Sequence, residues 1–207
     1  TTVPLNITTN ENTIWAGYTL NGGALTNMSN SSLIKWNATL SGLGTESTNT
    51  LIIYANDTSN NQGNTTTIFY ADTLAPRFTS ISASPNPANE TQNVICNAYV
   101  NDTFSLSSVK IGENASVSGT FQNHTIDLFS AGYANYTILN NAKGGYTCQF
   151  FATDAAGNSN TTSTTFTVND VTAPTLSINS PLNQTYSNSN ILFSISSDEN
   201  LTQANYT

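Results

Sequence analysis

Short runs in which apolar and polar residues alternate recur along the whole chain, and they predict β-strands. Clear examples are NVICNAYV (93–100) and YTCQFFAT (146–153). A period of two places successive side chains on opposite faces of a strand, so one face can line a core while the other meets water. Turn-forming Asn, Asp and Gly separate the runs. The pattern favours an all-β fold made of sandwiches.

Two long stretches share one design: an alternating strand, a polar turn, a Thr-rich strand, then Asp-x-x-Ala-Pro and a new strand. They are LIIYANDTSNNQGNTTTIFYADTLAPRFTSISASP (51–85) and CQFFATDAAGNSNTTSTTFTVNDVTAPTLSINSP (148–181). The pairs Ala75-Pro76 and Ala173-Pro174 lie 98 residues apart. Pro extends the residue before it and cannot continue a central ladder, so each pair marks a junction between units.

These junctions divide the chain into three parts. Residues 76–173 form one complete immunoglobulin-like unit, since its seven short strands separated by turns are typical of that sandwich. The strands are expected near 78–84, 93–100, 107–111, 117–121, 125–129, 145–153 and 162–168. Residues 1–75 follow the same design without its first strand, with Leu5 at the position of Cys96 and Leu51 at that of Cys148. Residues 174–207 are a partial third unit, a strand-forming tail.

The chain ends on a segment that is similar to its beginning. ILFSISSDENLTQANYT (191–207) aligns without a gap to VPLNITTNENTIWAGYT (3–19). Identical pairs are Ile195/Ile7, Glu199/Glu11, Asn200/Asn12, Ala204/Ala16, Tyr206/Tyr18 and Thr207/Thr19. The tail is thus the beginning of a third unit, and it includes the first strand, which is the strand that the head unit lacks. Whether 191–207 replaces 3–19 in an assembly, or adds to it, stays open.

Each end of the chain carries what the other end lacks. A sandwich without an outer strand exposes its interior and an unpaired strand edge. Alternating apolar residues give the tail an apolar face with no core of its own: Leu176, Ile178, Ile191, Phe193 and Ile195. We predict that these residues form a donor strand that completes the head of the next subunit, so that identical subunits join head to tail in a filament. Burying them would contribute on the order of 10 kcal/mol gross per joint.

The chain has two cysteines, Cys96 and Cys148, each inside a strand-like run. An isolated pair in a secreted chain favours a disulfide, although two buried thiols are the alternative. Tyr146 stands two residues before Cys148, which is the spacing of the tyrosine corner in immunoglobulin-like sandwiches. No Trp lies near Val109–Ile111, where antibody-type domains carry one.

Asn-x-Ser/Thr sequences indicate an extracellular protein that carries covalent N-glycans. Apart from these glycans, we expect no cofactor. The acceptors are Asn6, Asn27, Asn30, Asn37, Asn56, Asn64, Asn89, Asn101, Asn114, Asn123, Asn135, Asn160, Asn183, Asn200 and Asn205. A chain so rich in Asn, Ser and Thr would form more than half of them by chance, but a secreted protein with this many acceptors is expected to carry glycan on several.

Charge is sparse and acidic: 8% of residues are charged and the net charge is −8. Nucleic acids and anionic membranes both require basic clusters, so neither is expected as a partner. No apolar run is long enough to span a membrane, and we expect no membrane insertion. So few titratable groups also predict that stability depends weakly on pH.

Other functions have weaker support. The single histidine, His124, has no visible nucleophile or metal partner and is expected at the surface, and no catalytic motif is present, so no enzyme is expected. Four aspartates near the ends of the repeats could bind calcium between units: Asp57, Asp72, Asp154 and Asp170. However, Asp57 and Asp154 open polar turns, where Asp is expected for backbone reasons alone. The main expectation is therefore no metal.

Two further sites are conceivable. A carbohydrate platform could use Trp15, Trp36 and Tyr54, although their alternating strand positions favour the core. A Lys–Asn isopeptide bond could use Lys35 or Lys110, the two lysines in expected strands.

The run TLNGG…NATLSGLGTESTNTLIIYANDTSNNQGNTTTIFYADTLAP resembles the tandem immunoglobulin-like repeats of archaeal and bacterial surface proteins. The resemblance covers essentially the whole chain and implies the fold rather than an activity. A narrower resemblance is to the subunits of archaeal thread filaments. It implies a heavily N-glycosylated surface fibre joined by donor-strand complementation, with a role in adhesion or biofilm. The alternative is a fragment of a long tandem-repeat adhesin or surface-layer stalk.

Overall fold

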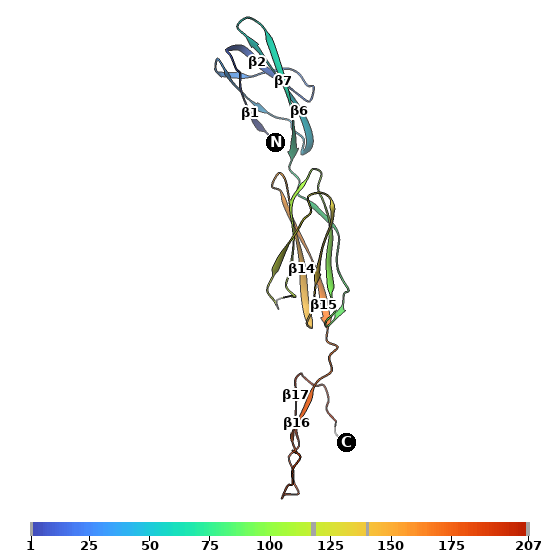
Figure 1. The fold of residues 1–207 in the computed structure, drawn as a ribbon. Helices are drawn as coiled ribbons and strands as arrows, with labels where there is room; N and C mark the ends of the chain where they lie inside the picture. Colours follow the sequence, from blue (N-terminus) through green and yellow to red (C-terminus); the bar gives the residue numbers. More distant parts are fainter. Residues whose placement is uncertain (1, 117–118, 140, 206–207) are drawn as a thin grey trace.

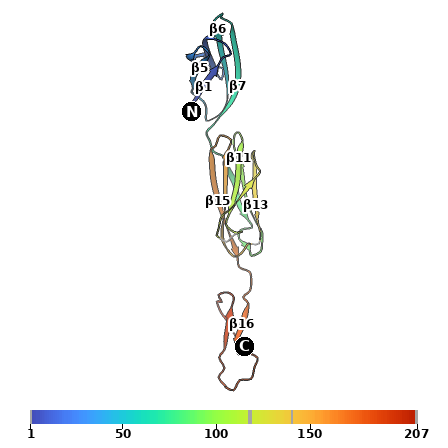
Figure 2. The same cartoon turned by 60° about the vertical axis from the view of Figure 1, so that its left-hand side comes forward.

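The computed structural model describes residues 2–116, 119–139 and 141–205, and its described elements are all β-strands. Figure 1 shows two sandwiches and a hairpin following one another, and Figure 2 shows the same order from another side. We name them the head unit (β1–β7), the middle unit (β8–β15) and the tail (β16, β17 and the residues up to 205). The prediction of an all-β chain with tandem immunoglobulin-like sandwiches is confirmed.

The head unit packs a three-stranded sheet, β1-β5-β4, against a four-stranded sheet, β3-β2-β6-β7. Its strands are β1 (Val3–Thr8), β2 (Thr13–Leu20), β3 (Thr26–Asn27), β4 (Ser29–Ser32), β5 (Lys35–Leu40), β6 (Glu46–Asp57) and β7 (Gln62–Asp72). Six buried residues centre its core: Ala16, Tyr18, Met28, Trp36, Leu40 and Leu51. Leu5, at the position expected to match Cys96, packs against this cluster together with Ile7.

The middle unit packs β13-β10-β8 against β12-β11-β14-β15-β9. Its strands are β8 (Arg77–Ser84), β9 (Ala88–Asn89), β10 (Val94–Asn101), β11 (Leu106–Glu113), β12 (Gln122–Ile126), β13 (Gly132–Ile138), β14 (Gly144–Asp154) and β15 (Ser159–Asn169). Alternation fixes the core: in β14, Cys148, Phe150 and Ala152 are buried in turn. Each fully buried Phe contributes about 2–3 kcal/mol by leaving water.

Two expected strands of the middle unit were placed wrongly. Of the strand expected over 117–121, residues 119–121 are not in a strand, and 117–118 lie outside the described residues. The strand expected over 125–129 lies earlier, at 122–126, and β13 was missed. β13 reads GYANYTI with only Ala134 and Ile138 fully buried, so its apolar signal is weak. It is a strand because β10 offers a ladder along its whole length, from Val94–Ile138 to Val100–Gly132.

The tail is a two-stranded antiparallel hairpin of β16 (Leu176–Ser180) and β17 (Ser194–Ser197). β17 is shorter than the expected 191–197. Leu176 lies opposite Ser197 and Ile178 opposite Ile195. Since isolated hairpins are marginally stable in water, the tail depends on what its apolar face contacts.

Candidate functional site

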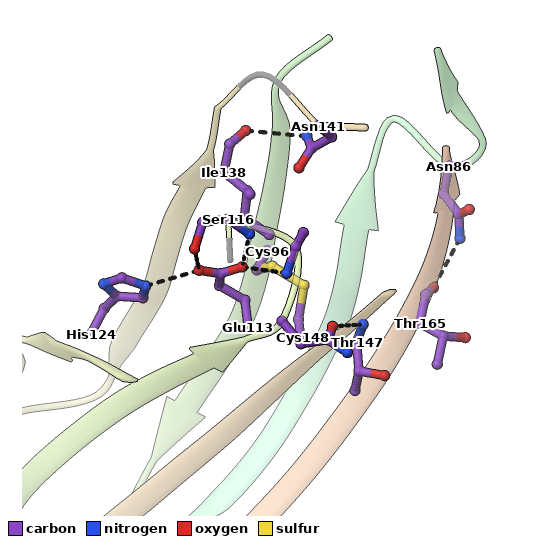
Figure 3. Close-up of a disulfide and its surroundings, with 12 residues drawn as sticks. Asn86, Cys96, Glu113, Ser116, His124, Ile138, Asn141, Thr147, Cys148 and Thr165 are labelled. Atoms are coloured by element: carbon purple, nitrogen blue, oxygen red, sulfur yellow. Dashed lines mark hydrogen bonds and ion pairs between the residues drawn. A yellow bond between two sulfur atoms is a disulfide. The ribbon is translucent and has the colours of Figure 1, made fainter. Parts of the chain in front are cut away.

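Cys96 and Cys148 form a disulfide between β10 and β14, one strand from each sheet of the middle unit (Figure 3). Their Cα atoms lie 6.0 Å apart and both side chains are fully buried. Two residues earlier, the Tyr146 hydroxyl donates a hydrogen bond to the carbonyl of Ala142 at 2.9 Å, the contact of a tyrosine corner. Both features hold the N-terminal half of β14 in place.

Glu113 lies beside the disulfide, with no exposed side-chain surface (Figure 3). Burial alone would raise the pKa of Glu113. Hydrogen bonds outweigh this effect, so the pKa is lowered overall; they come from the Ser116 hydroxyl, the backbone amides of Ser116 and Ala115, and the His124 ring. The Ala115 and Ser116 amides donate to Oε2 at 2.8 and 2.9 Å. A buried carboxylate is tolerated because these donors replace water.

His124 is not the surface residue that the sequence suggested. Its Nε2 lies 3.3 Å from Glu113 Oε1 and its side chain is 26% exposed. The ring stacks on Tyr136 with centroids 3.6 Å apart. The sequence hid this contact because His124 and Glu113 lie on neighbouring strands, eleven positions apart. The contact between His124 and Glu113 supports the turn that follows β11, because Glu113 also accepts hydrogen bonds from that turn.

The junction between head and middle units is fastened by side chains from both sides. Glu46 Oε1 accepts the amides of Thr73 and Leu74 at 3.2 and 3.1 Å. From the middle unit, Asn160 Nδ2 donates to the Pro76 carbonyl at 2.9 Å. Asn158 Nδ2 reaches the Asp72 carbonyl at 3.4 Å. The extended linker around Ala-Pro therefore has defined hydrogen-bond partners instead of free backbone groups.

Three aspartates meet at this junction: Asp72 from the head and Asp102 and Asp154 from the middle unit. One carboxylate oxygen of each lies within 4.8 Å of the others. Desolvation, followed by repulsion from Asp154, Asp102 and Glu46, raises the pKa of Asp72 to about 6. The carboxylates are hard oxygen ligands of the kind that Ca²⁺ takes, although Asp154 already accepts both the amide and the side chain of Asn158.

The two other aspartates considered for calcium lie elsewhere. Asp57 accepts the amides of Ser59 and Asn61 within its own turn, both at 2.8 Å. Hydrogen bonds from the Asn61 side chain and amide lower the pKa of Asp57. Asp170 belongs to the second junction, so the four aspartates do not form one site.

At the junction between middle unit and tail, Lys143 joins the two parts. Its Nζ lies 2.6 Å from Asp170 Oδ2 and 3.4 Å from Glu199 Oε2. Hydrogen bonds to these two carboxylates raise the pKa of Lys143. Glu90 Oε2 accepts the Thr172 hydroxyl at 2.8 Å, which fixes the linker as Glu46 does at the first junction.

The head unit has an open strand edge. In the middle unit β10 pairs with β13 on one side and β8 on the other, whereas β1, its counterpart, pairs among the described residues with β5 alone. A cavity of about 270 Å³ lies beside this edge. Its lining includes Ile7, Thr9, Ile53, Ala55 and Thr65.

The tail hairpin has an apolar groove of about 570 Å³. Four of the five residues predicted as a donor strand line it: Leu176, Ile178, Phe193 and Ile195. Ile191 is exposed but is not part of the lining. Leu176 and Ile178 are 55% and 63% exposed, although they are the apolar residues of a strand. The structure brings these residues together. The other lining residues were not part of the predicted donor strand: Pro174 before β16, and Leu201, Gln203, Ala204 and Asn205 after β17.

The sequon asparagines lie on the surface of all three parts. Eleven are exposed: Asn6, Asn27, Asn30, Asn64, Asn89, Asn123, Asn135, Asn160, Asn183, Asn200 and Asn205. Asn37, Asn56, Asn101 and Asn114 are partly buried. Asn114 Oδ1 accepts the Thr147 amide at 2.8 Å, so its side chain also has a structural role.

The remaining candidate residues have structural explanations. Trp36 is buried, and its indole N–H donates to the Thr13 hydroxyl at 2.7 Å. Trp15 and Tyr54 are partly buried, so these three rings do not form one exposed platform. Lys35 and Lys110, the two lysines considered for an isopeptide bond, are exposed.

No family model matches the chain, and no curated protein matches its sequence. Among solved structures, it is similar to a tetra-tandem repeat in the extending region of a large adhesion protein, at 17% identity over 95% of this chain and 59% of the other, with a TM-score of 0.48. A 1.5-MDa bacterial ice-binding adhesin aligns at 16% identity over 86% and 62%, with a TM-score of 0.40. Fibronectin(III)-like modules of Clostridium thermocellum CbhA align at 13% identity over 81% and 86%, also with a TM-score of 0.40. The chain spans about three fifths of the two adhesin structures.

No helix among the described residues is long and apolar enough to cross a membrane.

Proposed function

We propose that this chain is a structural segment of an extracellular surface fibre, and that neighbouring segments join head to tail by strand addition. The observation that carries the proposal is that the two ends of the chain are complementary. β1 has an open edge with a cavity beside it, and the tail has an exposed apolar groove. Strand addition supplies ladder hydrogen bonds to the edge and buries apolar side chains of the added strand.

The junctions support an extended, load-bearing role. Glu46 at the first junction and Glu90 at the second each fix the linker that follows the last strand of a sandwich. A linker with bonded backbone groups limits bending between units. The disulfide and the sequons support an extracellular location, because disulfides persist in oxidising compartments.

A spacer within a longer adhesin is the second candidate, because the same Asp-x-x-Ala-Pro junction occurs twice within this chain. There, the strand beside β1 would come from the preceding unit of the same polypeptide. Both candidates are non-catalytic and use the same edge, but only the filament joins separate molecules of this chain.

Self-association of the purified chain separates the two candidates. We would compare the full chain with Ile178→Asp, in the groove, and Leu192→Asp, which is 74% exposed and outside the groove lining. Negative-stain microscopy and sedimentation should show fibres for the full chain and Leu192→Asp, and monomers for Ile178→Asp. Three monomeric samples of equal stability would refute the filament and leave the spacer.

A further inference from the structure

The segment that follows the tail loop is a structural counterpart of the head's first strand. Residues 191–205 match 3–17 without a gap, with Ile195 at the position of Ile7 and Glu199 at that of Glu11. In the hairpin, β17 pairs with β16 along one edge. The tail therefore already contains a copy of the segment whose edge is open in the head.

The hairpin register transfers directly to the head. Leu176 lies opposite Ser197 and Ser177 opposite Ser196. In the 191–205 to 3–17 alignment, Ser197 corresponds to Thr9 and Ser196 to Thr8. β16 placed beside β1 would thus have Leu176 opposite Thr9.

The complete middle unit gives the same register independently. There, Phe78 of β8 lies opposite Val100 of β10. The interval between the Ala-Pro pairs places Phe78 at the position of Leu176, and the interval between Cys96 and Leu5 places Val100 at that of Thr9. Both comparisons set Leu176 opposite Thr9.

The head has space for this side chain. In the middle unit the Phe78 ring packs against Phe150, with centroids 6.3 Å apart. The head residue at the position of Phe150 is Ile53, which lines the cavity beside β1 together with Thr9. A strand in the predicted register would therefore place Leu176 over Ile53, in the cavity of about 270 Å³.

Charge matches as well. Lys143 contacts Glu199 at 3.4 Å, and Glu199 has its counterpart in the exposed Glu11 of the head. If a second copy's β1 took the place of β17, its Glu11 would meet Lys143 where Glu199 stands now. Lys143 would exchange one carboxylate partner for another and so keep an ion pair. The apolar groove of the tail would be covered by the head unit of the second copy.

From these observations we infer that β17 is an internal stand-in for β1, and that the head of a second copy displaces it from β16. Leu176 then enters the cavity over Ile53, and Lys143 changes its partner from Glu199 to Glu11 of the second copy. The inference rests on the proposed head-to-tail association and identifies its donor strand as β16. It also gives the two similar segments, 3–17 and 191–205, different roles: the second protects the donor strand until the first, from another copy, replaces it.

A charge-reversal pair tests the exchange. Glu11→Lys places Lys against Lys143 in the joint but leaves the Lys143–Glu199 pair of the monomer intact, so this variant alone should associate about tenfold more weakly than the native chain at low ionic strength. Lys143→Glu faces Glu199 in the monomer and Glu11 in the joint alike, so this variant alone should associate nearly as the native chain does. When the two variants are mixed, both kinds of joint between unlike chains bring opposite charges together, so association of the Glu11→Lys chain should be restored by the Lys143→Glu chain. Lys110→Glu, the same change on an exposed residue of β11, should associate as the native chain does.

Hydrogen exchange provides the second readout. In the assembled protein the amides of Ser194–Ser197 should exchange faster than in the monomer, because β17 has left its ladder, while those of β16 should exchange more slowly. Association without restoration on mixing, or with β17 still protected, would overturn the exchange but leave head-to-tail joining intact. A native chain that never associates would count against both.

Discussion

Removal of the disulfide should destabilise the middle unit and leave the head unit unchanged. The perturbation is the double substitution Cys96→Ala/Cys148→Ala. The bond joins residues 52 positions apart, and closing such a loop removes unfolded-chain entropy worth about 4 kcal/mol at 25 °C. Both sulfur atoms lie in the core, so some packing is lost as well. For a unit of this size, that loss corresponds to a fall in Tm of about 20 °C.

The two tryptophans make the assay selective. Trp15 and Trp36 both belong to the head unit, so tryptophan fluorescence follows its unfolding alone. Calorimetry follows both units. The variant should lower one calorimetric transition and leave the fluorescence transition in place, and native protein treated with reductant should behave like the variant. If the fluorescence transition fell equally, or the loss were below about 1 kcal/mol, the assignment of the bond as a local staple of the middle unit would be refuted.

Two further changes test the junction and the tyrosine corner. Asp72→Asn should stabilise the protein above pH 6: the folded-state pKa of about 6 exceeds the ordinary 3.8, so ionisation of Asp72 costs stability as pH rises from about 4 to 6. The gain in thermal stability should vanish below pH 4, and the exposed Asp127→Asn should show no such gain; a pH-independent difference would contradict the repulsion. Tyr146→Phe removes the 2.9 Å bond to Ala142 and should cost about 1 kcal/mol in denaturant unfolding, whereas Tyr133→Phe, at a 57% exposed residue, should be neutral. Equal effects of the two Tyr→Phe changes would argue against the corner.

Local pattern was sufficient for those features of the fold that depend on neighbouring residues. Strict alternation predicted β10 and β14, because a strand that buries one face must place an apolar residue at every second position. Ala-Pro marked both junctions, because Pro constrains the backbone wherever it occurs. β13 was missed because its stability comes from a ladder with β10, about forty residues earlier in the chain.

Contacts between distant residues were decided only by the tertiary structure. Asp72, Asp102 and Asp154 are far apart in the sequence, and no local pattern shows that the end of β7 meets two turns of the next unit. Glu113 and His124 likewise meet only because β11 pairs with β12. Titration depends on such distances, so the raised pKa of Asp72 could not be predicted from the sequence.

The sequence by itself determined that this chain is a series of like units, because repeats, Pro junctions and alternation are properties of the chain order. It also showed that the tail resembles the head. Only the tertiary structure placed the two similar segments: among the described residues β1 pairs on one side alone, a cavity lies next to Ile53, and β17 lies against β16 with Lys143 beside Glu199. The physical reason is that an unpaired edge and its complement are defined by which strands lie side by side, and strand order in a sheet is a long-range property of the fold.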